Sequence, residues 1–140
     1  MTGFHTFGRP SYPHRLGVAA IAETMLPKLL APHSLERRPE LGNAGRDIMH
    51  STSLEGMLGD LAAMAGRPDS TPTLPTIQVP TLVVHGAQDS LIPLSEAQAM
   101  RQAIPNAHLE VIAQAGHLPT LEAPQAYNQV VRQFLKQFYT

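Results

Sequence analysis

Two short apolar segments, each followed by a polar loop, constrain the fold of this chain most strongly. The first is Thr81–His85, which is rich in β-branched residues, and the second is Leu109–Ile112. A helical pattern lies between them, and the order strand, helix, strand predicts two parallel strands joined by a right-handed crossover. Because a short continuous apolar segment is typical of a buried parallel strand, we expect both faces of Thr81–His85 to be covered.

Composition and periodicity divide the chain into four regions. Residues 1–16 have no regular periodicity and predict a loop or a disordered segment. Residues 17–65 carry apolar residues at helical spacing, and residues 66–76 contain three prolines and predict a linker. Residues 77–140 hold the two strands, the helix between them and a final amphipathic helix, so the sequence predicts an α/β unit preceded by a helical segment.

Two prolines are expected to shape the start of the helical region. Pro27 lies inside the first helical pattern, lacks an amide donor and clashes with the carbonyl one turn back, so we expect two short helices that meet at a bend there. We expect Pro32 to stop the second of them.

Capping residues predict where three later helices begin. Asn43 is expected to cap a short helix that runs through His50. Thr52, with a Glu three residues on, forms a capping box before an apolar stripe that continues to Ala65. Ser95 with Gln98 predicts the start of the helix between the two strands.

Charge and length exclude several classes of protein. The 140 residues fit one domain, and a formal net charge of -1 gives no basic surface that would attract a phosphate backbone. No apolar segment approaches the roughly 20 residues that a membrane span requires, and the first residues lack the apolar part of a secretory signal. The sequence contains no cysteine, which is compatible with a reducing compartment. We therefore expect a cytoplasmic protein that binds neither nucleic acid nor membrane.

The residues that follow the two strands are the candidates for chemistry. Asp89 comes shortly after the first strand and His117 shortly after the second, 28 positions apart. The carboxyl ends of neighbouring parallel strands meet at one edge of a sheet, so a contact between this carboxylate and this imidazole is geometrically reasonable. A neutral imidazole transfers protons near neutral pH, and a carboxylate on its other nitrogen fixes the tautomer.

Sequence motifs around these residues resemble a known family. Val79–Asp89 reads VPTLVVHGAQD and Gln114–Glu122 reads QAGHLPTLE. In this combination, Ile77–Lys136 resembles the carboxyl-terminal part of the α/β-hydrolase superfamily. Leu26–Pro32 and Met64–Asp69 further resemble the lid region of bacterial members similar to 3-oxoadipate enol-lactonases and esterases.

The resemblance implies a role for each matching residue. Asp89 would be the acid and His117 the base of a catalytic triad that acts on an ester, lactone or similar acyl substrate without a cofactor or metal. Leu118 would lie near the substrate pocket, and Glu122 and Pro124 would start the last helix. Residues 17–65 would form a lid over the site.

The third member of such a triad has no counterpart in this sequence. No Gly-x-Ser-x-Gly elbow occurs, nor a variant with Cys or Asp at its centre. The glycine-rich loop that supplies an oxyanion donor is also missing. We therefore interpret the chain as the lid and carboxyl-terminal half of a hydrolase from a truncated or split reading frame, and we expect it not to catalyse acyl transfer alone.

Three interpretations of the chain remain open. The chain is either an enzyme half, a non-catalytic ligand-binding remnant of the fold, or a small βαβ domain in which Asp89 and His117 do not meet. His85 together with these two residues would offer imidazole and carboxylate ligands that suit zinc. An apolar strand that ends on a polar residue explains His85 equally well, and we expect no metal site.

A sheet of two strands leaves backbone groups without partners. The open edge of Thr81–His85 predicts marginal stability, pairing with a complementary amino-terminal half, or self-association. The narrow sheet is also expected to leave the apolar stripe of the last helix, which includes Phe134, Leu135 and Phe138, incompletely buried.

Overall fold

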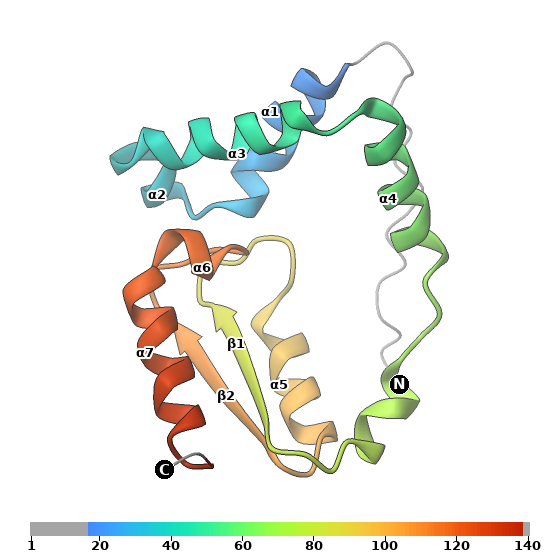
Figure 1. Ribbon diagram of the computed structural model, residues 1–140, viewed down its shortest axis with the longest axis vertical. Coiled ribbons are helices and arrows are strands. Elements are labelled where there is room, and N and C mark those ends of the chain that lie inside the picture. Colours follow the sequence, from blue (N-terminus) through green and yellow to red (C-terminus); the bar gives the residue numbers. More distant parts are fainter. Residues whose placement is uncertain (1–16, 139–140) are drawn as a thin grey trace.

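A computed structural model describes residues 17–138 as a helical segment placed over a small α/β unit (Figure 1). The predicted loop at residues 1–16 lies outside the described residues. The elements, in chain order, are α1 (Val18–Leu29), α2 (Pro32–Arg37), α3 (Pro39–Ser51), α4 (Leu54–Gly66), the 3₁₀ helix η1 (Thr71–Thr76), β1 (Thr81–Gly86), α5 (Leu94–Ala103), β2 (Ala107–Ile112), α6 (Pro119–Glu122) and α7 (Pro124–Leu135).

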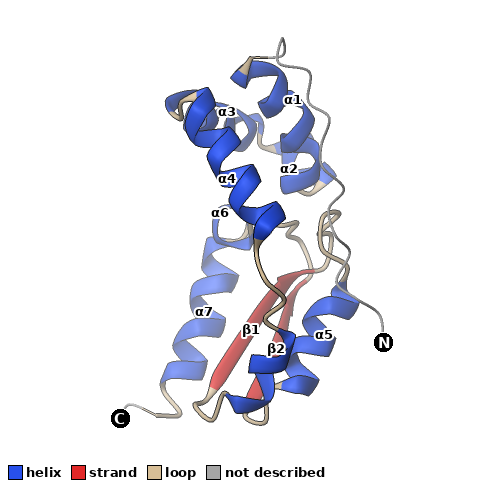
Figure 2. Ribbon diagram, turned by 90° about the vertical axis from the view of Figure 1, so that its right-hand side faces the viewer, coloured by secondary structure: helices blue, strands red, loops and turns tan. Residues whose placement is uncertain are grey.

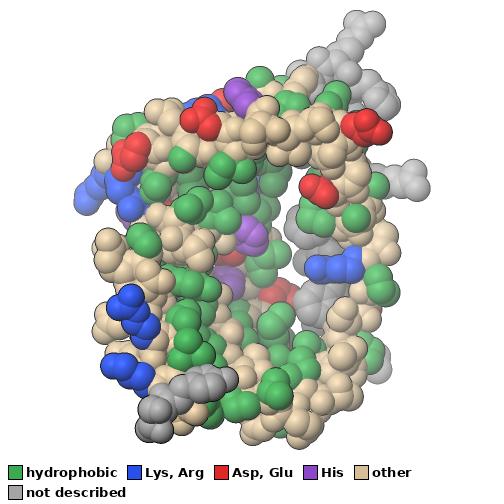
Figure 3. Space-filling view, viewed as in Figure 1, with side chains coloured by type: hydrophobic (Ala, Val, Ile, Leu, Met, Phe, Trp, Pro, Cys, Tyr) green, Lys and Arg blue, Asp and Glu red, His purple; other side chains and the backbone are tan. Residues whose placement is uncertain are grey.

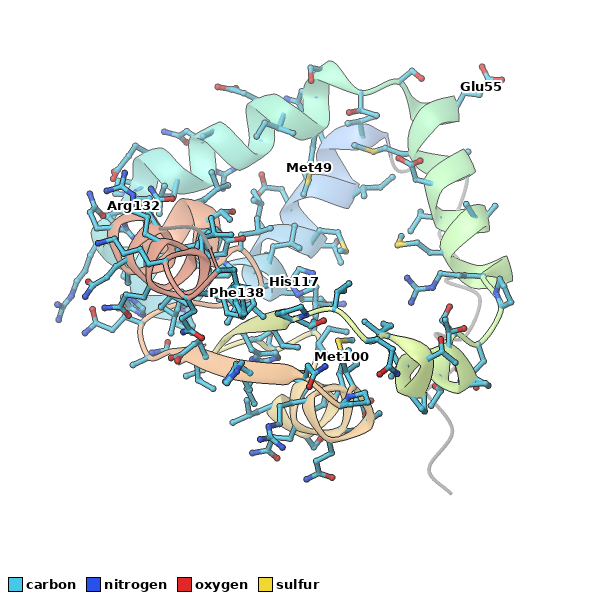
Figure 4. The ribbon with its side chains drawn as sticks, turned by 60° about the horizontal axis from the view of Figure 1, so that its bottom comes forward. Met49, Glu55, Met100, His117, Arg132 and Phe138 are labelled. Carbon is cyan, nitrogen blue, oxygen red and sulfur yellow. The ribbon has the colours of Figure 1, made fainter. Side chains whose placement is uncertain are left out.

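The α/β unit has the predicted order and direction of strands. β1 and β2 are parallel and pair from Thr81 with Ala107 to Gly86 with Ile112. Helix α5 connects them, and α5 and α7 lie on opposite faces of the sheet. They flank the strands in Figure 2, and Figure 4 shows α7 above the strands and α5 below them. Both strands end on the side that faces α1 and α2 (Figure 1).

The expected bend at Pro27 is wrong. α1 continues through Pro27 and ends at Leu29. Pro27 lies in the last turn, where its missing amide removes one hydrogen bond close to the helix end. The chain becomes extended at Leu30, and Pro32 then opens α2 instead of only stopping α1, because a proline in the first helical turn has no partner to lose.

The predicted helix starts are displaced at all three capping sites. Asn43 lies inside α3, which begins at Pro39. α4 is capped by Ser53, not Thr52, and the Ser53 hydroxyl accepts a hydrogen bond from the Gly56 amide at 3.0 Å. α5 starts before Ser95, because the Pro93 carbonyl already accepts the amide of Glu96. Each helix exists, but its first turn is set by a proline or by a neighbouring serine.

The expectation that β1 is covered on both faces is also wrong. Residues 81–84 are only half-buried, and burial is complete only at His85 and Gly86. Two strands present too narrow a surface for the flanking helices to enclose. For the same reason the stripe of α7 remains partly exposed, as predicted: Leu135 and Phe138 each keep more than two fifths of their surface in solvent.

The buried apolar side chains lie mainly where the helical segment meets the strand ends. The core consists of Ile21, Ala22, Leu26, Leu30, Ala31, Ala97, Ile104, Ala107, Ile112 and Ala115. None of the helices between residues 17 and 138 combines the length and apolarity needed to cross a bilayer.

Candidate active site

The candidate site lies at the carboxyl ends of both strands. Asp89 follows β1 by three residues and His117 follows β2 by five. Figure 4 labels His117 between the sheet and the helical segment, and Figure 3 shows histidine and acidic side chains in the hollowed middle of the same molecule. This is the crevice in which parallel α/β sheets gather functional groups.

Asp89 and His117 meet directly. His117 Nδ1 lies 2.8 Å from Asp89 Oδ2. The other carboxylate oxygen, Oδ1, accepts the amides of Leu91 at 2.8 Å and Ile92 at 3.0 Å. The Asp89 side chain is 4% exposed, whereas that of His117 is 35% exposed. The carboxylate is thus fixed and dry, and the imidazole reaches solvent.

The electrostatics of Asp89 define the tautomer of His117. Burial of Asp89 is the largest influence and by itself would raise the carboxyl pKa, but hydrogen bonds from the Ile92 amide, His117 and the Leu91 amide outweigh it and hold the pKa below its usual value. Asp89 is therefore ionised at neutral pH and can only accept. It follows that Nδ1 of His117 carries the proton, which leaves Nε2 of the neutral ring as a base.

His85 supports this carboxylate from the end of β1. Its Nε2 lies 3.1 Å from the Ile92 carbonyl, so Nε2 donates, and 3.7 Å from Asp89 Oδ2. Its Nδ1 is buried with no hydrogen-bond partner among the described residues. The zinc alternative receives no support, because no group of three or more His, Cys, Asp or Glu side chains within residues 17–138 is arranged to hold a metal ion.

Two glycines allow the site loops to pack backbone against backbone. A Cβ on Gly86 would lie 2.0 Å from the Gly116 carbonyl oxygen and 2.4 Å from that of Ala115. The Gln88 amide donates to the same Ala115 carbonyl at 2.9 Å. The loop of Asp89 and the loop of His117 are therefore held together by main-chain contacts as well as by their side chains.

The helical segment joins the same arrangement. The His117 amide donates to the Leu29 carbonyl at 3.0 Å, and a Cβ on Gly116 would approach the Ala31 nitrogen to 2.7 Å. We call residues Leu29–Ala31, Gly86–Asp89 and Ala115–Glu122 together the junction. The junction connects the end of α1 to both site loops.

Sequence reasoning misjudged Glu122. Glu122 does not start the last helix but ends α6, a short helix that was not predicted, while α7 begins at Pro124. Its side chain is buried, and its carboxylate accepts the amides of Gly116 and Ala31. The only signal in the sequence was an acid five residues after His117, and periodicity cannot show that such a residue is buried.

The contact between Asp89 and His117 excludes one of the open alternatives but does not test the role of Leu118. A βαβ domain that merely imitates the pattern would keep Asp89 and His117 apart, and their contact contradicts it. Leu118 is half-buried at the start of α6 and next to His117 in the chain. Its contact with a substrate remains a prediction.

The proteins of similar sequence include an enol-lactonase and a hydrolase. A family model described as alpha/beta hydrolase fold matches residues 28–124. The chain is 32% identical over 122 residues to 3-oxoadipate enol-lactonase 2 of Acinetobacter baylyi, which covers 87% of this chain and 45% of that protein. The 2-hydroxy-6-oxononadienedioate/2-hydroxy-6-oxononatrienedioate hydrolase of Pseudomonas sp. is 30% identical to this chain. That alignment covers 75% of this chain and 37% of that hydrolase.

Solved structures agree with these relatives. A thermophilic esterase from Thermogutta terrifontis superposes with a TM-score of 0.85 and 38% identity, covering 90% of this chain and 46% of the esterase. The enol-lactonase of Burkholderia xenovorans LB400 gives a TM-score of 0.73 at 28% identity, over 84% of this chain and 44% of that one. The chain thus spans less than half the length of each of these four proteins. By its matched residues and its fold, the chain belongs to the α/β-hydrolase fold family.

Proposed function

We propose that Asp89 and His117 are the acid and base of a site that hydrolyses esters, lactones or similar acyl substrates. One observation carries the proposal: Nδ1 of His117 is held at 2.8 Å by a buried carboxylate, while the ring remains about one third exposed for proton transfer at Nε2. The esterase and enol-lactonases among the similar proteins support the substrate class.

The chemistry follows from this geometry. Nε2 removes the proton of a hydroxyl nucleophile as its oxygen attacks the acyl carbonyl, and the resulting imidazolium is stabilised by Asp89. The imidazolium then returns that proton to the leaving alkoxide, which departs as an alcohol. Nε2 next takes a proton from water, the hydroxide attacks the acyl intermediate, and the acid is released as the nucleophile regains its proton.

The nucleophile in this proposal comes from a segment outside this sequence. Within residues 17–138, no hydroxyl is hydrogen-bonded to His117: the buried Ser34 hydroxyl accepts from Arg38, and the Ser90 hydroxyl donates to the Lys28 carbonyl. The elbow motif that would present such a hydroxyl is absent from the 140 residues. The chain alone is therefore expected not to turn over esters.

We also propose that the edge of β1 facing away from β2 receives the strand that brings the nucleophile. Within the described residues the sheet has two strands, so this edge carries backbone groups without a strand partner. A complementary amino-terminal half of a related hydrolase fits this edge, and a second copy of the chain competes for it. Residues 17–65 would then serve as a lid, because α1 and α2 lie over the strand ends (Figure 1).

A complementation assay tests the proposal. The purified chain is assayed on p-nitrophenyl acetate alone and after mixing with an amino-terminal half, including its nucleophile elbow, from a related esterase. We expect turnover only in the mixture, and His117→Ala should reduce it by at least about 10³-fold, because loss of the base leaves the nucleophile inactive. His50→Ala is the matched control, since His50 is an exposed histidine on α3.

The outcomes separate the parts of the proposal. Turnover in the mixture that survives His117→Ala would contradict the role of His117. Turnover by the isolated chain that His117→Ala abolishes would keep the acid and base but contradict an external nucleophile. Size-exclusion chromatography of the mixture reports whether the two halves associate at all, so that a failure to assemble is recognised as such.

A further inference from the structure

Glu122 carries a buried carboxyl group that the proposed proton transfer does not use. Its side chain is 3% exposed, and both carboxylate oxygens are occupied. Oε1 accepts the Gly116 amide at 2.7 Å and Oε2 accepts the Ala31 amide at 2.7 Å. One side chain thus connects the residue before His117 to the turn between α1 and α2, where Ala31 lies 91 positions before Glu122 in the chain.

From this arrangement we propose that Glu122 is a positioning residue: its carboxylate fixes the His117 loop against the helical segment and so holds His117 in line with Asp89. The inference rests on the proposed function, because it concerns the orientation of the proposed base. Gly116 is the chain neighbour of His117, and the His117 amide itself donates to Leu29, two residues before Ala31. Displacing Gly116 would therefore move the imidazole relative to Asp89.

A carboxylate suits this position better than any neutral side chain of the same size. Two amide donors converge on it, and an ionised carboxylate offers two acceptor oxygens and no donor. A glutamine would offer one oxygen and one NH₂ group, so one of the two amides would face a donor. Hydrogen bonds to an ionised acceptor are also about twice as strong as neutral ones.

The main chain of Glu122 is anchored separately from its side chain. The Arg38 guanidinium donates to the Glu122 carbonyl oxygen at 2.5 Å, and also reaches the Ser34 hydroxyl at 3.4 Å. This contact fixes α6 to the end of α2 whatever the state of the carboxylate. A change at the Glu122 side chain can therefore alter the His117 loop while α6 stays attached.

The first test compares Glu122→Gln with Glu55→Gln by NMR of the chain itself. Both variants replace a carboxyl group by an amide, but Glu55 is exposed on α4, far from His117 in Figure 4. In Glu122→Gln we expect hydrogen exchange at the Gly116 or Ala31 amide to accelerate about tenfold or more. We also expect the ¹⁵N shifts of the His117 ring to move toward those of a ring without a fixed tautomer, whereas Glu55→Gln leaves both readouts unchanged.

Unchanged His117 ring shifts in a folded Glu122→Gln variant would overturn the proposal, even if its stability fell, because a purely structural role predicts that result. The His117 ring shifts are measured without turnover. They can therefore contradict the role of Glu122 while the complementation assay supports the proposed function, or support it while that assay contradicts the function.

A second variant keeps the test decisive if Glu122→Gln does not fold. Glu122→Asp keeps a carboxyl group but shortens the side chain by one methylene, so the group no longer reaches both the Gly116 and Ala31 amides. We expect the ¹⁵N shifts of the His117 ring to move in the same direction as in Glu122→Gln, whereas Glu55→Asp leaves them unchanged. Unchanged ring shifts in a folded Glu122→Asp variant would overturn the proposal.

Discussion

The junction and helix α4 both contain apolar side chains but differ in how these side chains are packed. In the junction, Leu30 and Ala31 are almost completely buried, and main-chain groups from three separate segments are hydrogen-bonded to one another. α4 carries an apolar stripe, yet none of its residues is buried. Its Leu54, Leu58 and Met64 each expose two fifths or more of their surface.

An amphipathic pattern therefore predicts a helix but not the burial of its apolar side chains. Burial requires an opposing surface, and in the described residues α4 has none, whereas α1 has the strand ends and the two site loops. The junction also contains two buried carboxyl groups with hydrogen-bond partners: Glu122 accepts the amides of Ala31 and Gly116, and Asp89 contacts His117. The geometry of the junction is therefore specified more narrowly than apolar contact alone would allow.

The largest effect should come from Gly86→Ala set against Gly59→Ala. A Cβ on Gly86 would overlap backbone atoms of Ala115 and Gly116, which cannot move without separating the site loops, so we expect a loss of more than about 3 kcal/mol in unfolding free energy. Gly59 in α4 has no atom within 4 Å of the added Cβ, and the same change should stabilise the chain by about 0.5–1 kcal/mol. Urea denaturation measures both changes in unfolding free energy, and equal effects would contradict the difference in packing between the junction and α4.

The next effect sharpens the contrast in apolar packing. Leu30 is 2% exposed and Leu58 is 43% exposed. Leu30→Ala should lower the unfolding free energy by about 2–4 kcal/mol, because it removes buried surface and leaves a cavity. Leu58→Ala should change it by less than about 0.5 kcal/mol. A large loss on Leu58→Ala would indicate that α4 packs against another surface in solution.

A smaller, pH-dependent effect should appear at Asp89. Asp89→Asn removes the ionised acceptor and should lower stability by about 1.5–3 kcal/mol at pH 7. Because the folded state lowers the Asp89 pKa, the stabilisation is present above the usual value of 3.8 and is lost as pH falls through the lower folded value. The difference between wild type and Asp89→Asn, measured in urea between pH 7 and pH 3, should therefore shrink at the acid end. A difference that grew toward pH 3 would contradict the assigned direction.

Sequence reasoning predicted the parallel strands, the crossover helix and the two residues that meet at their ends, because these depend on local patterns and on the geometry of parallel sheets. It did not predict the helix starts, since Pro39 and Pro93 determine the first turns and outweigh the side-chain caps expected at Asn43 and Ser95. A proline at or near a helix start fixes the backbone conformation of the first turn. A side-chain cap, in contrast, is only one of several ways to satisfy the first amides of the helix.

The role of Glu122 could not be predicted for a different reason. Its two partners, Gly116 and Ala31, are amides that any sequence supplies, and they converge only because the end of α1 lies beside the His117 loop. Contacts of this kind depend on tertiary arrangement and leave no periodic trace in the sequence. The exposure of β1 was misjudged for the same reason, because the number of strands beside an apolar segment also depends on tertiary arrangement.

The pairing of Asp89 with His117 is tested most simply by the ¹⁵N NMR spectrum of the His117 ring in its neutral form. We expect the proton of the neutral ring on Nδ1, where it exchanges slowly because Asp89 accepts it, and no proton on Nε2. We also expect Asp89→Asn to remove this preference. A His117 ring with its proton on Nε2, or one whose shifts do not change in Asp89→Asn, would contradict the claim that this carboxylate prepares this imidazole to act as a base.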